Sequence, residues 1–121
     1  MPARNPDEVD MLFQGALNSG NVDGIMELYE PDASFVAQDG QVATGHDAIR
    51  ATVKAFIDMN PQIDLKVEKT VPAGDDLAVC YGVWTLSASG QQMTGKSIEV
   101  VRRQPDGSWL FAIDDPWGRG T

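Results

Sequence analysis

The chain has 121 residues, of which 42% are hydrophobic and 22% charged, and it carries a formal net charge of -9. This length supports a single hydrophobic core, so we expect one domain over residues 1–121. Such an acidic surface repels phosphate groups, which argues against nucleic acid and anionic membranes as partners. No secretory signal is recognised, and no apolar run reaches the roughly 20 residues that cross a bilayer, so we expect a cytoplasmic protein.

The N-terminal residues have the pattern of two amphipathic helices. Asn5 and Pro6 suit the start of a first helix over residues 6–19. The apolar positions on its inner face are Val9, Leu12, Phe13, Ala16 and Leu17. Asn21 can cap a short second helix that Pro31 stops. The inner face of this helix consists of Val22, Ile25, Met26 and Tyr29.

A strand and a third helix follow. Residues 33–38 have strand character, and Asp39-Gly40 is typical of a hairpin turn. Thr44 and Asp47 have the spacing of a capping box, which predicts a helix over residues 46–59. Its inner face consists of Ile49, Val53, Phe56 and Ile57.

The rest of the chain predicts strands. Apolar and polar residues alternate from Ile63 to Glu68, as expected of a strand with one solvated face. Residues 77–87 are apolar on both faces, which indicates that the core covers one side and that a second subunit can cover the other. Residues 93–103 and 109–114 predict a final hairpin. Helices followed by an antiparallel meander indicate an α+β fold.

Two segments resemble a known superfamily. The stretch ALNSGNVDGIMELYEPDASF, residues 16–35, is similar to the opening of ketosteroid isomerase-like proteins in the nuclear transport factor 2-like superfamily. The stretch RRQPDGSWLFAIDDPW, residues 102–117, resembles the last hairpin of SnoaL-like proteins. The resemblance implies a cone-shaped, curved antiparallel sheet that three N-terminal helices cap around a pocket.

The resemblance also argues against a true ketosteroid isomerase. The position of the oxyanion-stabilising tyrosine of those enzymes is Phe13 here, which has no hydroxyl. The position of their aspartate base is Ala37, which cannot accept a proton. The position of their second acid is Glu99, which keeps a carboxyl group.

The same resemblance implies a set of pocket residues. Strand alternation places Glu99 with Ser97, and Asp114 with Ala112 and Leu110, on faces that look into the cone. The other residues expected around the pocket are Phe13, Leu17, Tyr29, Phe35, Ala37, Phe56, Met59 and Trp84.

Glu99 and Asp114 are the candidate catalytic residues. An apolar wall raises the pKa of a carboxyl group, so one acid can donate a proton while its partner accepts one. The alternative for Glu99 is solvent exposure or an ion pair with Lys96, Arg102 or Arg103. The alternative for Asp114 is to cap the turn that follows it.

The sequence therefore predicts a protein with a pocket for a small apolar or aromatic molecule. The first hypothesis is a cofactor-free acid–base enzyme of isomerase, lyase, cyclase or hydrolase type, and the alternative is a non-catalytic hydrophobic-ligand-binding or dimerisation module. No metal, flavin or nucleotide is expected, since no Gly-rich phosphate loop follows a strand and no ligand cluster is present. We expect a homodimer formed through the outer face of the sheet.

Overall fold

The computed structural model describes residues 2–120. Within these residues the elements follow one another in the order α1 (Glu8–Asn18), α2 (Val22–Met26), β1 (Tyr29–Val36), β2 (Val42–Thr44), α3 (His46–Ile57), β3 (Gln62–Ala73), β4 (Leu77–Ala88), β5 (Gln91–Arg103) and β6 (Trp109–Asp115). None of the helices in this part of the chain is long and apolar enough to span a membrane.

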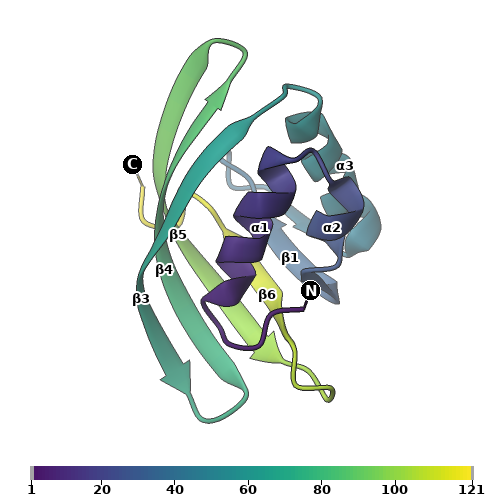
Figure 1. The fold of residues 1–121 in the computed structure, drawn as a ribbon, viewed down its shortest axis with the longest axis vertical. Helices are drawn as coiled ribbons and strands as arrows, with labels where there is room; N and C mark the ends of the chain where they lie inside the picture. The colour runs from purple at the N-terminus through teal and green to yellow at the C-terminus, as the bar shows by residue number, and fades with distance from the viewer. Residues whose placement is uncertain (1, 121) are drawn as a thin grey trace.

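The strands form one six-stranded sheet with the order β2-β1-β6-β5-β4-β3. Strands β3 to β6 are an antiparallel meander, whereas β1 pairs in parallel with β6. The long strands curve, and the helices pack on one side of the sheet (Figure 1). The predicted α+β class and the curved, helix-capped sheet are confirmed, with one parallel pair that the sequence pattern did not indicate.

Several predicted boundaries move by a few residues. The first helix begins after Asp7, which forms no side-chain cap, while Glu8 Oε1 accepts the N–H groups of Arg4 and Asn5. The predicted cap of the second helix is confirmed, because the Asn21 side chain accepts the N–H of Gly24 at 2.9 Å.

The region around the first strand differs more from the prediction. Tyr29 is the first residue of β1 and not part of the second helix, and Pro31 lies inside this strand. The capping box at Thr44 is wrong, since Thr44 belongs to β2 and its hydroxyl contacts that of Ser34. Gly45 precedes α3 instead, with a φ of 87° that favours glycine.

An irregularity between β5 and β6 changes which residues share a face. Val100 pairs with Ile113, but Val101 pairs with Phe111, so Ala112 is an extra residue in β6. Such a bulge reverses the alternation along the strand. Phe111 therefore shares the inner face with Asp114, where strict alternation predicted Leu110.

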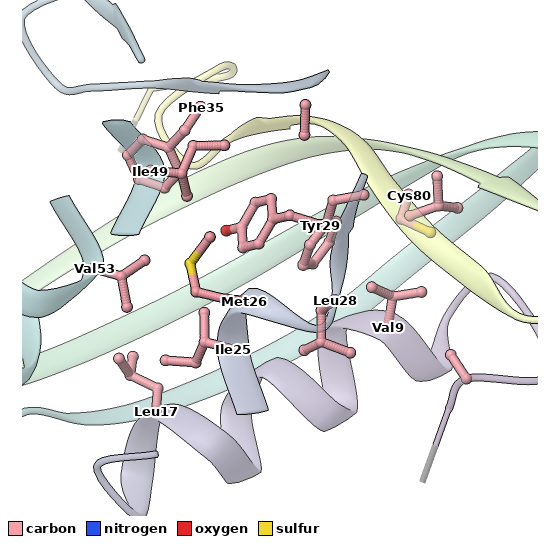
Figure 2. Close-up of a cluster of buried hydrophobic side chains, with 14 of the residues drawn as sticks. Val9, Leu17, Ile25, Met26, Leu28, Tyr29, Phe35, Ile49, Val53 and Cys80 are labelled. Carbon is pink, nitrogen blue, oxygen red and sulfur yellow. The ribbon is translucent and has the colours of Figure 1, made fainter. Parts of the chain in front are cut away.

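The hydrophobic core lies between the helices and the inner face of the sheet. Figure 2 shows Tyr29 in the middle of this cluster, between the helices and the strands behind it. Its ring contacts that of Phe111, with centroids 5.0 Å apart. Tyr29 and Phe111 are also paired across β1 and β6, so the parallel strand pair places the tyrosine deep inside the protein.

Candidate functional site

The core is hollow beside this cluster. A cavity of about 160 Å³ lies between the helices and the inner face of the sheet. Six of the residues expected around a pocket line it, namely Phe13, Leu17, Phe35, Ala37, Phe56 and Trp84. Further lining residues that the sequence interpretation did not include are Asp10, Gln38, Thr52, Val53, Ile63, Leu65, Leu86, Met93, Phe111, Pro116 and Trp117.

Two of the expected pocket residues lie elsewhere. Met59 follows α3, is 40% exposed and is not among the lining residues, because the helix ends at Ile57. Tyr29 is buried behind the cavity wall, and its hydroxyl donates a hydrogen bond of 2.5 Å to Oδ2 of Asp114. Tyr29 does not line the cavity itself but contacts it indirectly, through its hydrogen bond to Asp114.

Glu99 and Asp114 both line the cavity and are directly paired across β5 and β6. Their side chains are buried, with exposed fractions of 3% and 5%. Among residues 2–120, the ion pairs predicted as alternatives for Glu99 do not form. Arg102 pairs with Glu30, Arg103 pairs with Asp76, and Lys96 forms no ion pair with Glu99. The side chain of Asp114 bonds to Tyr29 and not to the following turn.

A third acid, Asp10, joins them from α1. It is 2% exposed and lines the same cavity. Sequence reasoning missed Asp10, although a signal was present. Asp10 precedes Phe13 by three residues and Leu17 by seven, so these spacings place an acid within the apolar face of the helix.

Burial makes Glu99 the most strongly perturbed of these acids. Its pKa is raised to about 11, first by burial and then by the neighbouring charge of Asp10. A protonated Glu99 can donate a hydrogen bond to an ionised Asp10, an interaction that raises the pKa of Glu99 and lowers that of Asp10. Near neutral pH, Glu99 is therefore the proton donor of the cluster.

The other two acids titrate closer to neutral pH. Burial raises the pKa of Asp10 to about 6 and that of Asp114 to about 7, while the hydrogen bond from Tyr29 opposes the shift at Asp114. The pKa of Tyr29 is raised well above its usual value by burial and by Asp114, so the phenol keeps its proton. The cluster combines one protonated acid with two acids that can be ionised near neutral pH.

Several polar atoms of the cluster have no partner within the described residues. Oδ2 of Asp10, Oε1 of Glu99 and Oγ of Ser97 are buried and form no hydrogen bond there. The lining includes no Lys, Arg or His among residues 2–120. In the same part of the chain, no group of three or more His, Cys, Asp or Glu is arranged to hold a metal ion.

The tail after β6 forms part of the cavity wall through Pro116 and Trp117. Trp84 Nε1 donates a hydrogen bond of 2.7 Å to the carbonyl of Pro116, and its ring meets that of Trp117 at a centroid distance of 4.7 Å. Gly95, opposite Trp84 on β5, gives the indole its space, since a Cβ there would lie 2.3 Å from the ring.

Residues 9–112 match the family model of the SnoaL-like domain. The chain belongs to this family. A comparison with functionally curated proteins found no match. The match includes Asp10 on α1 and Glu99 on β5, and it ends at Ala112, two residues before Asp114.

Solved structures share the fold at low sequence identity. An NTF-2 like protein of unknown function from Shewanella oneidensis MR-1 has a TM-score of 0.79 and 18% identity, covering 89% of this chain and 92% of that one. A ketosteroid isomerase-like protein from Erwinia carotovora atroseptica SCRI1043 has a TM-score of 0.76 and 15% identity, covering 89% and 88%. These likenesses support the nuclear transport factor 2-like fold and carry no reaction with them.

Proposed function

We propose that this protein is a cofactor-independent acid–base enzyme acting on a small, mostly apolar molecule. One observation carries the proposal: three buried carboxyl groups line a single hydrophobic cavity, and their pKa values are pushed apart. Carboxyl groups with separated pKa values are what paired general acid and base catalysis requires. The SnoaL-like family membership supports a ligand pocket at this place in the fold.

The arrangement suits proton transfer next to a carbonyl group. Asp114 is the proposed base, because Tyr29 holds its Oδ2 and leaves the other carboxylate oxygen for the substrate. The C–H bond breaks, its proton moves to Asp114, and the electron pair shifts onto the carbonyl oxygen. Protonated Glu99 donates a hydrogen bond to that oxygen, in place of the hydrogen bond that it can donate to Asp10. Returning the proton to another carbon of a conjugated enolate completes an isomerisation. Attack of the enolate carbon on a second carbonyl group, whose oxygen then takes the proton from Asp114, completes a cyclisation.

Exchange of carbon-bound hydrogen tests this step without knowledge of the natural substrate. Phenylacetone, cyclohexanone and butanone are incubated with the protein in D₂O near neutral pD, and loss of the α-proton signals is followed by NMR. We expect exchange with the protein, and a decrease of about 100-fold in Glu99→Gln and Asp114→Asn, since positioned acids and bases contribute factors of this order.

The matched control is Asp75→Asn, which removes an exposed carboxylate in the turn between β3 and β4. Exchange that persists undiminished in the Glu99→Gln/Asp114→Asn double variant, with its fold intact by circular dichroism, would contradict the acid–base proposal.

The second candidate function is binding without turnover. Phe13 and Ala37 line the cavity at the positions where ketosteroid isomerases carry a tyrosine and an aspartate base, and neither residue can exchange a proton. A bound aromatic compound that is recovered chemically unchanged, together with absent ketone exchange, would favour this alternative.

We also propose a homodimer through the outer face of the sheet, and we retain the predicted cytoplasmic location. Val71, Val79, Val100 and Ile113 are successive register partners across β3, β4, β5 and β6. Val71 is 39% and Ile113 is 43% exposed, so this apolar row reaches solvent. A monomer in sedimentation at micromolar concentration, or a dimer unaffected by Ile113→Glu, would contradict this interface.

A further inference from the structure

The charges around the cavity are unbalanced. An acid–base pair needs two carboxyl groups, which Glu99 and Asp114 supply, and Asp10 is a third. The lining includes no basic side chain in the described part of the chain. A buried carboxylate without a compensating positive charge is costly even when a protonated acid donates a hydrogen bond to it, so an acid kept at such a place requires an explanation.

Several arginine side chains form ion pairs away from the cavity acids. Among residues 2–120, four arginines form ion pairs with acids on the protein surface. The pairs are Arg50–Asp23, Arg102–Glu30, Arg103–Asp76 and Arg119–Glu68. None of these contacts reaches the cavity acids, and a ligand can supply a cation for them.

The unpartnered atoms define what this cation should look like. Oδ2 of Asp10, Oε1 of Glu99 and Oγ of Ser97 are three buried oxygens with free lone pairs. A primary ammonium group presents three N–H donors and no acceptor. The three oxygen atoms belong to residues that line one cavity, and they equal in number the N–H donors of one ammonium group. A ligand carboxylate would instead add a further negative charge next to Asp10.

We propose that the ligand of this cavity is a small organic cation, a primary ammonium group on an aromatic or branched apolar body, with the ammonium bound at Asp10 beside Glu99 and Ser97. This inference rests on the proposed function for the pocket itself and names the class of molecule that it takes. Asp114 and Glu99 remain available for proton transfer at a neighbouring atom of the same ligand.

The size of the cavity limits the apolar body. A cavity of roughly 150 Å³ with apolar walls holds one benzene molecule, and the volume here is about 160 Å³. The wall contains the rings of Phe13, Trp84 and Phe111. A single aromatic ring with a short arm that carries the nitrogen is therefore the expected size.

Three probes of nearly equal shape test the charge. Benzylamine, benzyl alcohol and benzoate are titrated against the whole protein by calorimetry and ligand-observed NMR at about pH 7, where the amine is protonated. We expect benzylamine to bind about tenfold more tightly than benzyl alcohol, as charge-assisted hydrogen bonds allow. Benzoate should bind most weakly of the three.

Two variants, Asp10→Asn and the control Asp75→Asn, test whether the preference for benzylamine depends on Asp10. Asp10→Asn should reduce the affinity for benzylamine by about tenfold while the affinity for benzyl alcohol stays within about twofold. Asp75→Asn removes the same charge from the exposed turn between β3 and β4 and should leave all three affinities unchanged. Binding of the amine should also lower the pKa of the Asp10 carboxyl, measured by carbon-13 NMR, which mere filling of the cavity would not do.

The outcomes separate this inference from the proposed function. Benzyl alcohol that binds as tightly as benzylamine, no binding by any of the three probes, or an amine preference that survives in Asp10→Asn would each overturn the cation site. In the first case, the acid–base function stays supported if ketone exchange depends on Glu99 and Asp114. A preference for the amine that Asp10→Asn abolishes, without exchange of any ketone, would support the cation site and count against the enzyme.

Discussion

The acids on the surface and the acids at the cavity differ in their partners. Four surface acids contact arginine side chains, with N–O distances between 2.6 and 3.3 Å. Asp10, Glu99 and Asp114 have neutral or acidic neighbours instead, and the Tyr29 hydroxyl donates a hydrogen bond of 2.5 Å to Asp114. The same residue type is thus ion-paired outside and uncompensated inside.

This difference indicates what the cavity acids contribute. Surface pairs are screened by water and stabilise a protein little. Uncompensated buried acids reduce the stability of the folded state whenever the unfolded chain is ionised, because their pKa values are raised. Groups that cost stability in this way are often retained for function. Three measurements can test the contrast.

The largest expected effect is a dependence of stability on pH that Glu99 causes. The folded protein keeps this acid protonated up to a pKa of about 11, whereas the unfolded chain ionises near the ordinary glutamate pKa of 4.5. The unfolded state therefore binds fewer protons, and the free energy of unfolding should fall by about 1.4 kcal/mol per pH unit between these values. Above about pH 7, Asp10 and Asp114 no longer add to this slope.

Glu99→Gln should flatten the slope above pH 7 and make the protein more stable than the wild type at pH 8. Urea unfolding at several pH values measures both curves. Glu27→Gln, which removes an exposed carboxylate after α2, is the matched control and should leave the slope unchanged. Parallel curves for the wild type and Glu99→Gln would show that Glu99 is ionised in the folded protein.

Much of this site was predictable from the sequence, because alternation along strands depends on local pattern. The inward faces of β5 and β1 follow from the rule that every second residue of a strand points to the same side. Helical spacing is enough to place Phe13, Leu17 and Phe56 on the inner faces of their helices. Asp10 was predictable in the same way, as an acid at helical spacing from Phe13. The sequence analysis omits it, because the predicted inner face of the helix includes apolar residues alone.

Other features depend on residues that are distant in the chain. Tyr29 begins β1 because it pairs with Phe111 on β6, and no local pattern contains that partner. The extra residue Ala112 in β6 depends on the register with β5. Thr44 has the local spacing of a helix cap, but its position opposite Ser34 on the neighbouring strand decides its role.

A smaller effect is expected from the tyrosine that donates a hydrogen bond to Asp114. Tyr29→Phe leaves Oδ2 of Asp114 without its hydrogen bond, and because this bond opposes the rise, the pKa of Asp114 should increase further above about 7. We expect a loss of about 1–3 kcal/mol at pH 8, where an ionised Asp114 is left unpaired, and a smaller loss at pH 5, where Asp114 is protonated.

Urea unfolding at these two pH values and a carbon-13 NMR titration of Asp114 measure both parts of that prediction. Tyr81→Phe is the control. The Tyr81 ring lies on the outer face of the sheet, and Cζ of Arg119 is 5.2 Å from the centroid of this ring. Equal losses at pH 5 and pH 8 would mean that the tyrosine acts through packing alone and does not stabilise the charge on Asp114.

The smallest effect is expected from a surface acid. Asp76 Oδ1 lies 2.6 Å from Arg103 Nη2, with side chains that are 68% and 45% exposed. Asp76→Asn removes this charge pair, and water and salt should compensate for most of it, so we expect a change of at most about 1 kcal/mol that shrinks further in high salt. Urea unfolding at low and high ionic strength measures it. A loss of stability larger than that of Tyr29→Phe at pH 8 would show that a short distance to an arginine contributes more to the free energy of unfolding than a buried hydrogen bond does. The contrast between the surface acids and the cavity acids would then be contradicted.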